Sequence, residues 1–371
     1  MRRLQSMLLA ILLGSFASMA WAADSAVILT YNRIDERGPA GLTLKSDTFE
    51  QHLRELTGGG YTIMPVADIV AAVRAGRPLP EKAVGITFDE AYASFYTQAW
   101  PRLQAAKVPF TVFVSPGLVD DGGPDMMTWD QLREVAENGG TIGHHGERPG
   151  DMPLLSEEEI ETSLADATAR FISMLGRKPT LFAYPFGSFG RVARDLVVAH
   201  GFDAAFGLHN GPVHAGSDPF ALPRFSLSDA YGTVGRLRMV ATTRPIKIKD
   251  ITPTDARVTR NPPAIGFTID QDLRNRQELR CYTFELTPAM EWLGDNRVEL
   301  RYAKPLPLGR IRVNCTMPGP GGRWYWLGMM LVLAPPDSRP PKSAARRYPQ
   351  RARASRFQSD ATKMTPDAGR R

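Results

Sequence analysis

The sequence predicts a parallel α/β domain followed by a smaller antiparallel β domain. Before about residue 240, short apolar segments typical of buried strands alternate with amphipathic helical patterns, the arrangement of parallel βα units. After residue 240 the helical period disappears, and proline-rich segments separate short runs of alternating apolar and polar residues. We therefore expect one α/β domain over residues 23–240 and a small β domain over residues 241–335.

The two ends of the chain differ in composition from the body. Residues 1–22 combine Arg2 and Arg3 with a short apolar stretch and an Ala-Trp-Ala ending, typical of a cleavable signal peptide. That stretch is too short to span a bilayer, and no other apolar segment is long enough for a transmembrane anchor. We expect a periplasmic or secreted protein. Residues 336–371 are basic and poor in apolar side chains, which predicts a disordered tail.

The net charge of +6 arises at the ends. The tail alone carries ten Lys and Arg against three Asp and Glu, so the body between signal peptide and tail has a net charge of −3. This body offers no basic groove for nucleic acid. The tail charge can draw the protein weakly to anionic cell-envelope polymers.

Three helical patterns are clear in the first domain. They cover residues 48–56, which precede three glycines, residues 65–75, and residues 157–175. The last begins with a predicted capping box between Ser156 and Glu159. We expect the apolar stripes of these helices to face the interior of the domain, and we assign them no chemistry.

Two carboxylates follow one predicted strand directly. The apolar run 83–86 leads into Thr87-Phe88-Asp89-Glu90. In a sheet covered by helices, the C-terminal strand ends form the usual reaction site. Adjacent carboxylates there can divide the work between binding a metal and moving a proton. The alternative is that Asp89 caps the next helix and Glu90 is solvated.

Two further segments have a similar form. Residues 141–145 form a predicted strand that ends in His144 and His145, two of the six histidines. Because neighbouring side chains on a strand point in opposite directions, only one of the two would face a shared centre. Residues 181–187 form an apolar strand that runs into an aromatic-proline turn. Tyr184, Pro185 and Phe186 in this turn can wall a sugar-sized groove, and packing in the core is the alternative.

Taken in order, these segments resemble the polysaccharide deacetylase superfamily, the NodB-homology hydrolases. The likeness spans residues 26–228 and includes the opening strand 28–33 and the late segment Leu222-Pro223-Arg224. It implies a distorted (β/α) barrel of the NodB type that hydrolyses acetamido groups on N-acetylhexosamine units of an oligo- or polysaccharide. Chitooligosaccharide, exopolysaccharide and peptidoglycan all present this group.

The resemblance also implies roles for individual residues. Asp89 matches the general base of the family, while Glu90 and His145 match ligands of a divalent metal, usually zinc. In the family a late histidine is the general acid. Here His214, or else His209, is the candidate.

Three positions depart from the family pattern. Glu90 replaces an aspartate, Asn32 replaces the histidine after the opening strand, and Pro149 replaces the second histidine ligand. A catalytic zinc normally keeps three protein ligands. We expect Asp151 to supply the third, with Glu147 and His144 as alternatives.

Two rival functions follow from these departures. If nothing completes the metal site, the domain is a catalytically impaired glycan-binding protein of the same fold. A glycosidase that uses Asp89 and Glu90 is disfavoured, because adjacent strand residues point to opposite faces and flank one glycosidic bond poorly.

The second domain offers two features. Trp324, Tyr325 and Trp326 can stack on sugar rings or fill a core. Cys281 and Cys315 are the only two cysteines, and export favours a disulfide between them. Strand parity argues against that bond, because Cys281 alternates with apolar neighbours that suggest it points away from the buried face. Both outcomes remain open from the sequence.

Overall fold

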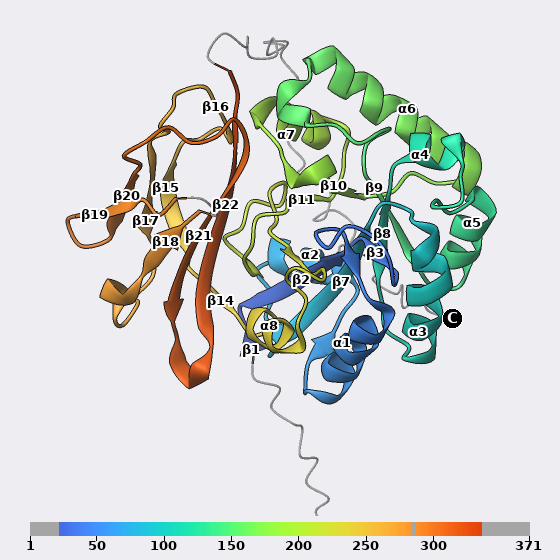
Figure 1. The fold of residues 1–371 in the computed structure, drawn as a ribbon, viewed down its shortest axis with the longest axis horizontal. Coiled ribbons are helices and arrows are strands. Elements are labelled where there is room, and N and C mark those ends of the chain that lie inside the picture. The colour runs from blue at the N-terminus through green and yellow to red at the C-terminus, as the bar shows by residue number, and fades with distance from the viewer. Residues whose placement is uncertain (1–21, 284–285, 336–371) are drawn as a thin grey trace, which may run out of the picture.

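A computed structural model describes residues 22–283 and 286–335, which form a barrel and a β-sandwich lying side by side (Figure 1). The predicted basic tail, and the predicted signal peptide except for Ala22, lie outside the described residues. Within the described residues, no helix is both long and apolar enough to cross a membrane.

The barrel is a ring of parallel strands, as the resemblance implies. Six strands pair in the order β11-β10-β9-β8-β7-β2, and β13 pairs in parallel with β2. A single parallel bridge between Phe206 and Leu222 then closes the ring. The ring strands are β2 (Ser25–Tyr31), β7 (Ala83–Asp89), β8 (Thr111–Val114), β9 (Thr141–His144), β10 (Leu181–Ala183), β11 (Ala204–Phe206) and β13 (Phe225–Ser226).

Each strand of the ring contributes to two cores, because alternate side chains point into the barrel and out toward the helices. Outward-facing residues such as Leu29 and Ile86 pack under the surrounding helices. Inward-facing residues such as Ile28 and Phe113 fill the barrel together with α2 (Val66–Arg74). Val66 of α2 lies so close to Gly85 of β7 that a Cβ there would come within 3.0 Å of it. Helix α2 therefore closes the N-terminal end of the barrel, and the C-terminal strand ends stay available for a site.

The outer helices agree well with the sequence pattern. The helix predicted at 48–56 is α1 (Ser46–Gly58), and α6 (Glu157–Leu175) has its predicted bounds and capping box. Figure 1 shows these helices around the strands. The others are α3 (Trp100–Ala105), α4 (Pro116–Asp121), α5 (Trp129–Glu137), α7 (Arg191–Ala199) and α8 (Val234–Val240), with a π-helical turn at Phe95–Ala99 and 3₁₀ turns at Met152–Leu154 and Pro185–Gly187.

Short strands complete this part of the chain. The strand β12 (Val213–His214) pairs antiparallel with the N-terminal half of β2. The remaining short strands are β1 (Ala22–Ala23), β3 (Arg33–Ile34), β4 (Thr43–Leu44), β5 (Thr62–Ile63) and β6 (Leu79–Pro80).

The C-terminal domain is a sandwich of two sheets with one apolar core between them. One sheet has β14 (Arg244–Pro245), β22 (Trp324–Leu333), β21 (Gly309–Pro318) and β18 (Arg280–Tyr282), with β16 (Arg257–Val258) beside β22. The other has β15 (Ile248–Thr252), β17 (Ile265–Ile269), β20 (Arg297–Arg301) and β19 (Ala289–Leu293). Most pairs are antiparallel as predicted, although β14 and β16 run parallel to β22.

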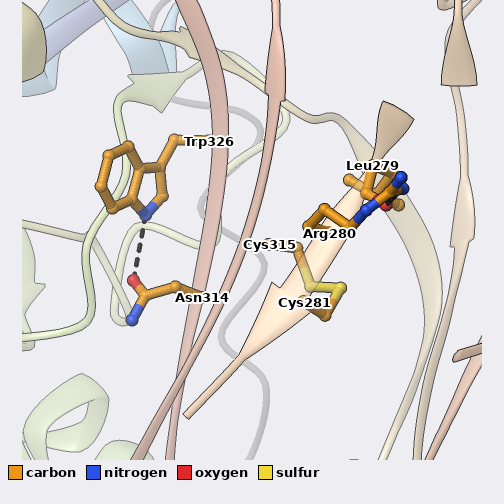
Figure 2. Close-up of a disulfide and its surroundings, with 6 residues drawn as sticks. All are labelled: Leu279, Arg280, Cys281, Asn314, Cys315 and Trp326. Carbon is orange, nitrogen blue, oxygen red and sulfur yellow. Dashed lines mark hydrogen bonds between the residues drawn. A yellow bond between two sulfur atoms is a disulfide. The ribbon is translucent and has the colours of Figure 1, made fainter. Parts of the chain in front are cut away.

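Cys281 and Cys315 form a disulfide (Figure 2). The two residues lie directly opposite each other on β18 and β21, so both point into the sandwich core. The parity argument against the bond was wrong because it misjudged which face of β18 is buried: Cys281 is buried, whereas Arg280 and Tyr282 are exposed.

The sheet of β21 and β22 lies against the barrel (Figure 1). Trp326 belongs to the barrel's outer core and meets Phe225 edge to face at 5.2 Å between ring centroids. Its indole N–H donates to the side-chain oxygen of Asn314 (Figure 2). The same oxygen accepts a hydrogen bond from the side chain of Asn210 in the barrel. Trp326 therefore fills a core and does not offer its ring to a sugar.

Candidate functional site

Asp89 is the last residue of β7 and points into the top of the barrel. Its two carboxylate oxygens accept hydrogen bonds from both terminal nitrogens of Arg224, at 2.6 and 2.8 Å. Arg224 stands just before β13, on the strand that closes the ring beside β2. The parallel register of the barrel therefore brings a carboxylate and a guanidinium together across its interior.

The Arg224 side chain is fully buried, yet each of its nitrogens has a partner. The remaining bonds go to the hydroxyls of Thr30 and Thr87, at 3.3 and 3.2 Å, and to the carbonyl of Gly207 at 3.1 Å. A buried charge pair is stable only when its geometry and its remaining hydrogen bonds are satisfied in this way.

The sequence interpretation noted Arg224 only as part of a family-like segment and missed its bond to Asp89. An arginine between apolar residues in a strand-like segment is a signal, because a buried arginine requires an acidic partner. The sequence does not say which of many acidic residues that partner is.

Glu90 and His145 form the second pair of the site. His145 Nε2 lies 3.6 Å from Glu90 Oε1, within the separation of roughly 3–4 Å expected for two ligands of one ion. Glu90 reaches this position with a positive φ of 64°, a conformation that turns its side chain away from ordinary strand alternation. Asp89 and Glu90 thus engage different partners.

Hydrogen bonding fixes the orientation of the His145 ring. Its Nδ1–H donates to the Ala183 carbonyl at 2.8 Å, so Nε2 is the ring nitrogen that faces Glu90. Burial raises the pKa of the Glu90 carboxyl, and the charge of Asp89 adds to this effect while His145 opposes it. Oε2 of Glu90 is buried and has no hydrogen-bond partner among the described residues. The pair therefore presents two atoms that can act as metal ligands, one carboxylate oxygen of Glu90 and Nε2 of His145.

These two donors do not make a complete metal site. Among the described residues, no group of three His, Cys, Asp or Glu side chains is arranged to hold an ion. A catalytic zinc normally has three protein ligands. The residues present therefore do not fit the metal centre that the resemblance implies, and we derive no chemical step through a metal.

None of the three proposed replacement ligands joins the pair. Asp151 instead accepts a hydrogen bond from Ser188 at 2.8 Å and lies 3.8 Å from Arg310. The Glu147 carbonyl accepts the backbone N–H of Gly117 at 2.9 Å, so this residue lies beside helix α4, and burial raises the pKa of its carboxyl. The expectation that Asp151 completes a metal site was wrong, because its turn directs it toward the β-sandwich.

His144 points to the outside of the barrel, as the alternation of strand β9 predicts. Its ring lies 5.1 to 5.3 Å from the rings of Phe171, Phe182 and Phe202. Burial lowers its pKa to about 3, and its Nδ1 accepts a hydrogen bond from the Gly146 amide. His144 is a neutral core residue.

His214 cannot be the general acid of this site. In β12 it pairs with Ser25 at the N-terminal end of β2, whereas Asp89 lies at the other end. At about 3.3 Å per residue, the two are separated by roughly 20 Å. The assignment was wrong because β12 runs antiparallel and returns the chain to the bottom of the barrel.

His209 lies nearer, beside Gly207 and the Arg224 side chain. Burial lowers its pKa to about 4, helped by the charges of Arg224 and Arg312, and its Nδ1 has no hydrogen-bond partner among the described residues. It is neutral near pH 7, and a neutral imidazole is a poor general acid.

The aromatic-proline turn divides between core and surface. Tyr184 is fully buried, and its hydroxyl donates to the Phe220 carbonyl at 2.9 Å, so its assignment to a sugar groove was wrong. Pro185 lies beside Gly146, next to His145. The Phe186 side chain is 41% exposed and has a positive φ of 56°. Pro185 and Phe186 therefore border the site.

A separate cavity of about 540 Å³ lies between the barrel and the sandwich. His209 and His214 contribute to its lining, together with Trp326 and Met330, whereas Asp89, Glu90 and His145 do not. This cavity is distinct from the polar site at the strand ends.

The fold and this site define an α/β-barrel protein whose charged residues gather at the C-terminal strand ends. Residues 76–205 match the family model described as polysaccharide deacetylase. Over this segment the chain is similar to polysaccharide deacetylases, in agreement with the motifs at the strand ends.

Individual relatives agree. The chain is 24% identical over 257 residues to the poly-β-1,6-N-acetyl-D-glucosamine N-deacetylase of Escherichia coli K12, covering 57% of this chain but only 38% of that protein. It is 24% identical over 201 residues to the putative polysaccharide deacetylase YxkH of Bacillus subtilis, covering 54% of this chain and 71% of that one.

Solved structures show the same fold. Streptococcus pyogenes deacetylase PplD aligns with a TM-score of 0.55 at 22% identity, covering 58% of this chain and 98% of that one. IcaB from Ammonifex degensii aligns with a TM-score of 0.54 at 24% identity, covering 60% and 99%. These alignments cover nearly all of each solved chain but less than two thirds of this one, which also contains the β-sandwich.

Proposed function

We propose that this protein removes N-acetyl groups from N-acetylhexosamine units of an extracellular oligo- or polysaccharide. The observation that carries this proposal is the Asp89 carboxylate, held by Arg224 beside the Glu90–His145 pair at the C-terminal end of a polysaccharide deacetylase barrel. Several relatives are named as N-deacetylases of poly-β-1,6-N-acetyl-D-glucosamine, which supports a glycan of this class. The predicted signal peptide supports a periplasmic or secreted location.

In this proposal Asp89 accepts a proton from the water that attacks the acetyl carbonyl, and it returns that proton to the leaving amine as the C–N bond breaks and acetate forms. Arg224 uses one hydrogen bond to each carboxylate oxygen, which leaves further lone pairs on both oxygens free to accept a proton. The bidentate contact also fixes the orientation of the carboxylate, as a positioned base requires. Glu90 and His145 border the same space and position the acetamido group.

A second candidate function is glycan binding without turnover. The observation in its favour is that Pro149 and Asn32 occupy two positions where the family has histidines, and no third described ligand joins Glu90 and His145. The rim residues Pro185 and Phe186 are retained in either case.

Acetate release separates the two functions. Purified protein is incubated with β-1,6- and β-1,4-linked N-acetylglucosamine oligomers, with and without added zinc, and free acetate and free amine are measured. Equal release of both by wild type and none by Asp89→Asn supports the deacetylase. Oligomer binding with no acetate from the wild type at any zinc concentration would contradict it and support glycan binding alone.

A further inference from the structure

The face of strand β21 that meets the barrel carries a row of polar side chains. Its odd-numbered residues, such as Ile311 and Val313, lie in the sandwich core. Arg310, Arg312 and Asn314 alternate with them and therefore face the barrel, and the Asn314 side chain accepts a bond from Asn210 there.

Arg312 has no acidic partner within residues 22–283 and 286–335. Its side chain is exposed and makes no hydrogen bond or ion pair with any part of the chain that the structure describes. Surrounding protein and the neighbouring Arg310 both lower the pKa of this guanidinium. Arg310 itself lies 4.5 Å above the Phe186 ring and 3.8 Å from the Asp151 carboxylate.

A second arginine approaches from the barrel. Arg236, in the first turn of α8, stacks 5.7 Å from the ring centre of Tyr231 and 5.9 Å from that of Trp326. No acidic side chain in the described ranges pairs with Arg236, and its Nε is buried without a hydrogen-bond partner. Burial lowers its pKa.

Trp326 links the two arginines. Arg236 lies over its ring, and its indole N–H bonds to Asn314, which is two residues from Arg312 on the same face of β21. The Tyr231 ring, which is 49% exposed, lies on the other side of Arg236 at 5.7 Å. Two guanidinium groups that lack acidic partners within the described residues and one exposed aromatic ring thus lie in one region where the two domains touch.

This cluster lies on the same edge of the barrel as Asp89. Tyr231 follows shortly after Ser226, which pairs with Thr30, and the Thr30 hydroxyl accepts a bond from Arg224. Arg312 lies close enough to His209 to help lower its pKa, and the His209 carbonyl accepts the backbone N–H of Arg224. A glycan that crosses the strand ends can therefore reach both places.

We propose that Arg236, Tyr231 and Arg312 form a subsite for an acidic sugar, so that the glycan bound here carries carboxylates beside its N-acetylhexosamine units. The exposed Tyr231 ring offers a stacking face for a pyranose, and the arginines supply paired donors that match a carboxylate. The inference rests on the proposed function, since it names the substrate class. The carboxylate has two sources, a uronic acid ring or a lactyl ether, and the test separates them.

Binding to matched acidic and neutral probes tests the subsite. The first probe is a hyaluronan tetrasaccharide, in which glucuronic acid alternates with N-acetylglucosamine. The second is the disaccharide of N-acetylglucosamine and N-acetylmuramic acid, which carries a lactyl carboxylate. The methyl ester of each probe is its neutral control, and calorimetry at low ionic strength gives the dissociation constants.

We expect at least one acidic probe to bind the wild type about tenfold more tightly than its ester, the change typical of one hydrogen-bonded charge contact. Added salt should reduce this preference. Arg312→Gln and Arg236→Gln should each abolish it, and Arg312→Lys should retain part of it. Arg274→Gln removes an exposed charge from the segment after β17, which belongs to the other sheet of the sandwich. It is the matched control and should retain the whole preference.

Two outcomes would overturn the subsite: equal wild-type affinity for acid and ester forms of both probes, or an acid preference unchanged in both glutamine variants. Thermal melting checks that each variant is folded. Acetate release is measured on the same samples. Acid preference without acetate release refutes the proposed deacetylase activity but supports the subsite. Acetate release without acid preference refutes the subsite but supports the deacetylase activity.

Discussion

Asp89 and Arg224 lie 135 residues apart in the chain and form a bidentate ion pair inside the barrel, with both side chains almost fully buried. The pair joins the end of β7 to the segment that closes the ring. The same contact therefore positions the proposed base and ties the last barrel strand to the centre of the sheet.

Removing one partner of this pair should be more damaging than removing both. Arg224→Met leaves a buried carboxylate without its counter-ion, and we expect the free energy of unfolding to fall by about 3–5 kcal/mol. In the double variant Asp89→Leu/Arg224→Met no buried charge remains, so its loss should be smaller than that of Arg224→Met alone and well below the sum of the losses in Arg224→Met and Asp89→Leu. Urea denaturation of all four proteins measures this. Additive losses would show that the pair is not coupled.

Restoring the family's histidine should strengthen zinc binding. With Glu90 and His145 alone we expect weak binding, and Pro149→His should tighten it by more than roughly tenfold by supplying a third ligand. Pro149→Ala relieves the proline constraint without adding a donor, so it is the control. Competition with a chromophoric chelator gives the affinities. Equal affinity in both variants would mean that residue 149 does not reach the pair.

Stability should decline in mild acid because of His144. Its pKa falls from an ordinary 6.5 to about 3 in the folded protein, so between these values the unfolded chain binds more protons. The free energy of unfolding should therefore drop as the pH falls through this window, by up to about 1.4 kcal/mol per pH unit. His144→Phe should flatten the dependence. Phe171→Leu, which disturbs the same packing without a titrating group, should not.

The disulfide should stabilise the sandwich. Cys281 and Cys315 are separated by 34 positions, and closing a loop of this length contributes about 3–4 kcal/mol in the chain-entropy model. We expect a Cys281→Ser/Cys315→Ser variant to unfold more easily by that order in chemical denaturation. A thiol assay on the denatured, unreduced protein should find no free thiol. Two thiols per chain would contradict the bond.

Tyr184 and Phe186 should respond oppositely to substitution. Tyr184→Phe removes a buried hydrogen bond and should lower the free energy of unfolding by about 1 kcal/mol without changing glycan affinity. Phe186→Ala should weaken binding of an N-acetylglucosamine oligomer and barely change stability. Melting curves and calorimetry separate the effects. If Tyr184→Phe lost glycan affinity while keeping normal stability, Tyr184 would have to contact the glycan after all.

The sequence predicted the parts of this protein that depend on local pattern. Helix α6 has its predicted bounds because the capping box and the apolar stripe are both local signals. The opposite orientations of His144 and His145 follow from strand alternation. The resemblance supplied the barrel.

Features set by distant contacts were harder to predict. The partner of Arg224 depends on ring closure, and the position of His214 depends on the antiparallel course of β12, which no local pattern reveals. Glu90 reaches His145 through a positive φ that its residue type does not suggest. Asp151 lies in the loop that was expected to replace the missing ligand, but its carboxylate faces Arg310 of the other domain.

The contact between Phe225 and Trp326 has a consequence for how this protein can be handled or reshaped. An indole from the last described strand fills the outer core of the first domain, so a chain ended after α8 would leave an aromatic-sized apolar hollow beside β13. The barrel is thus not a detachable module. Truncations, fusions and domain exchanges that keep the barrel should keep the sandwich as well.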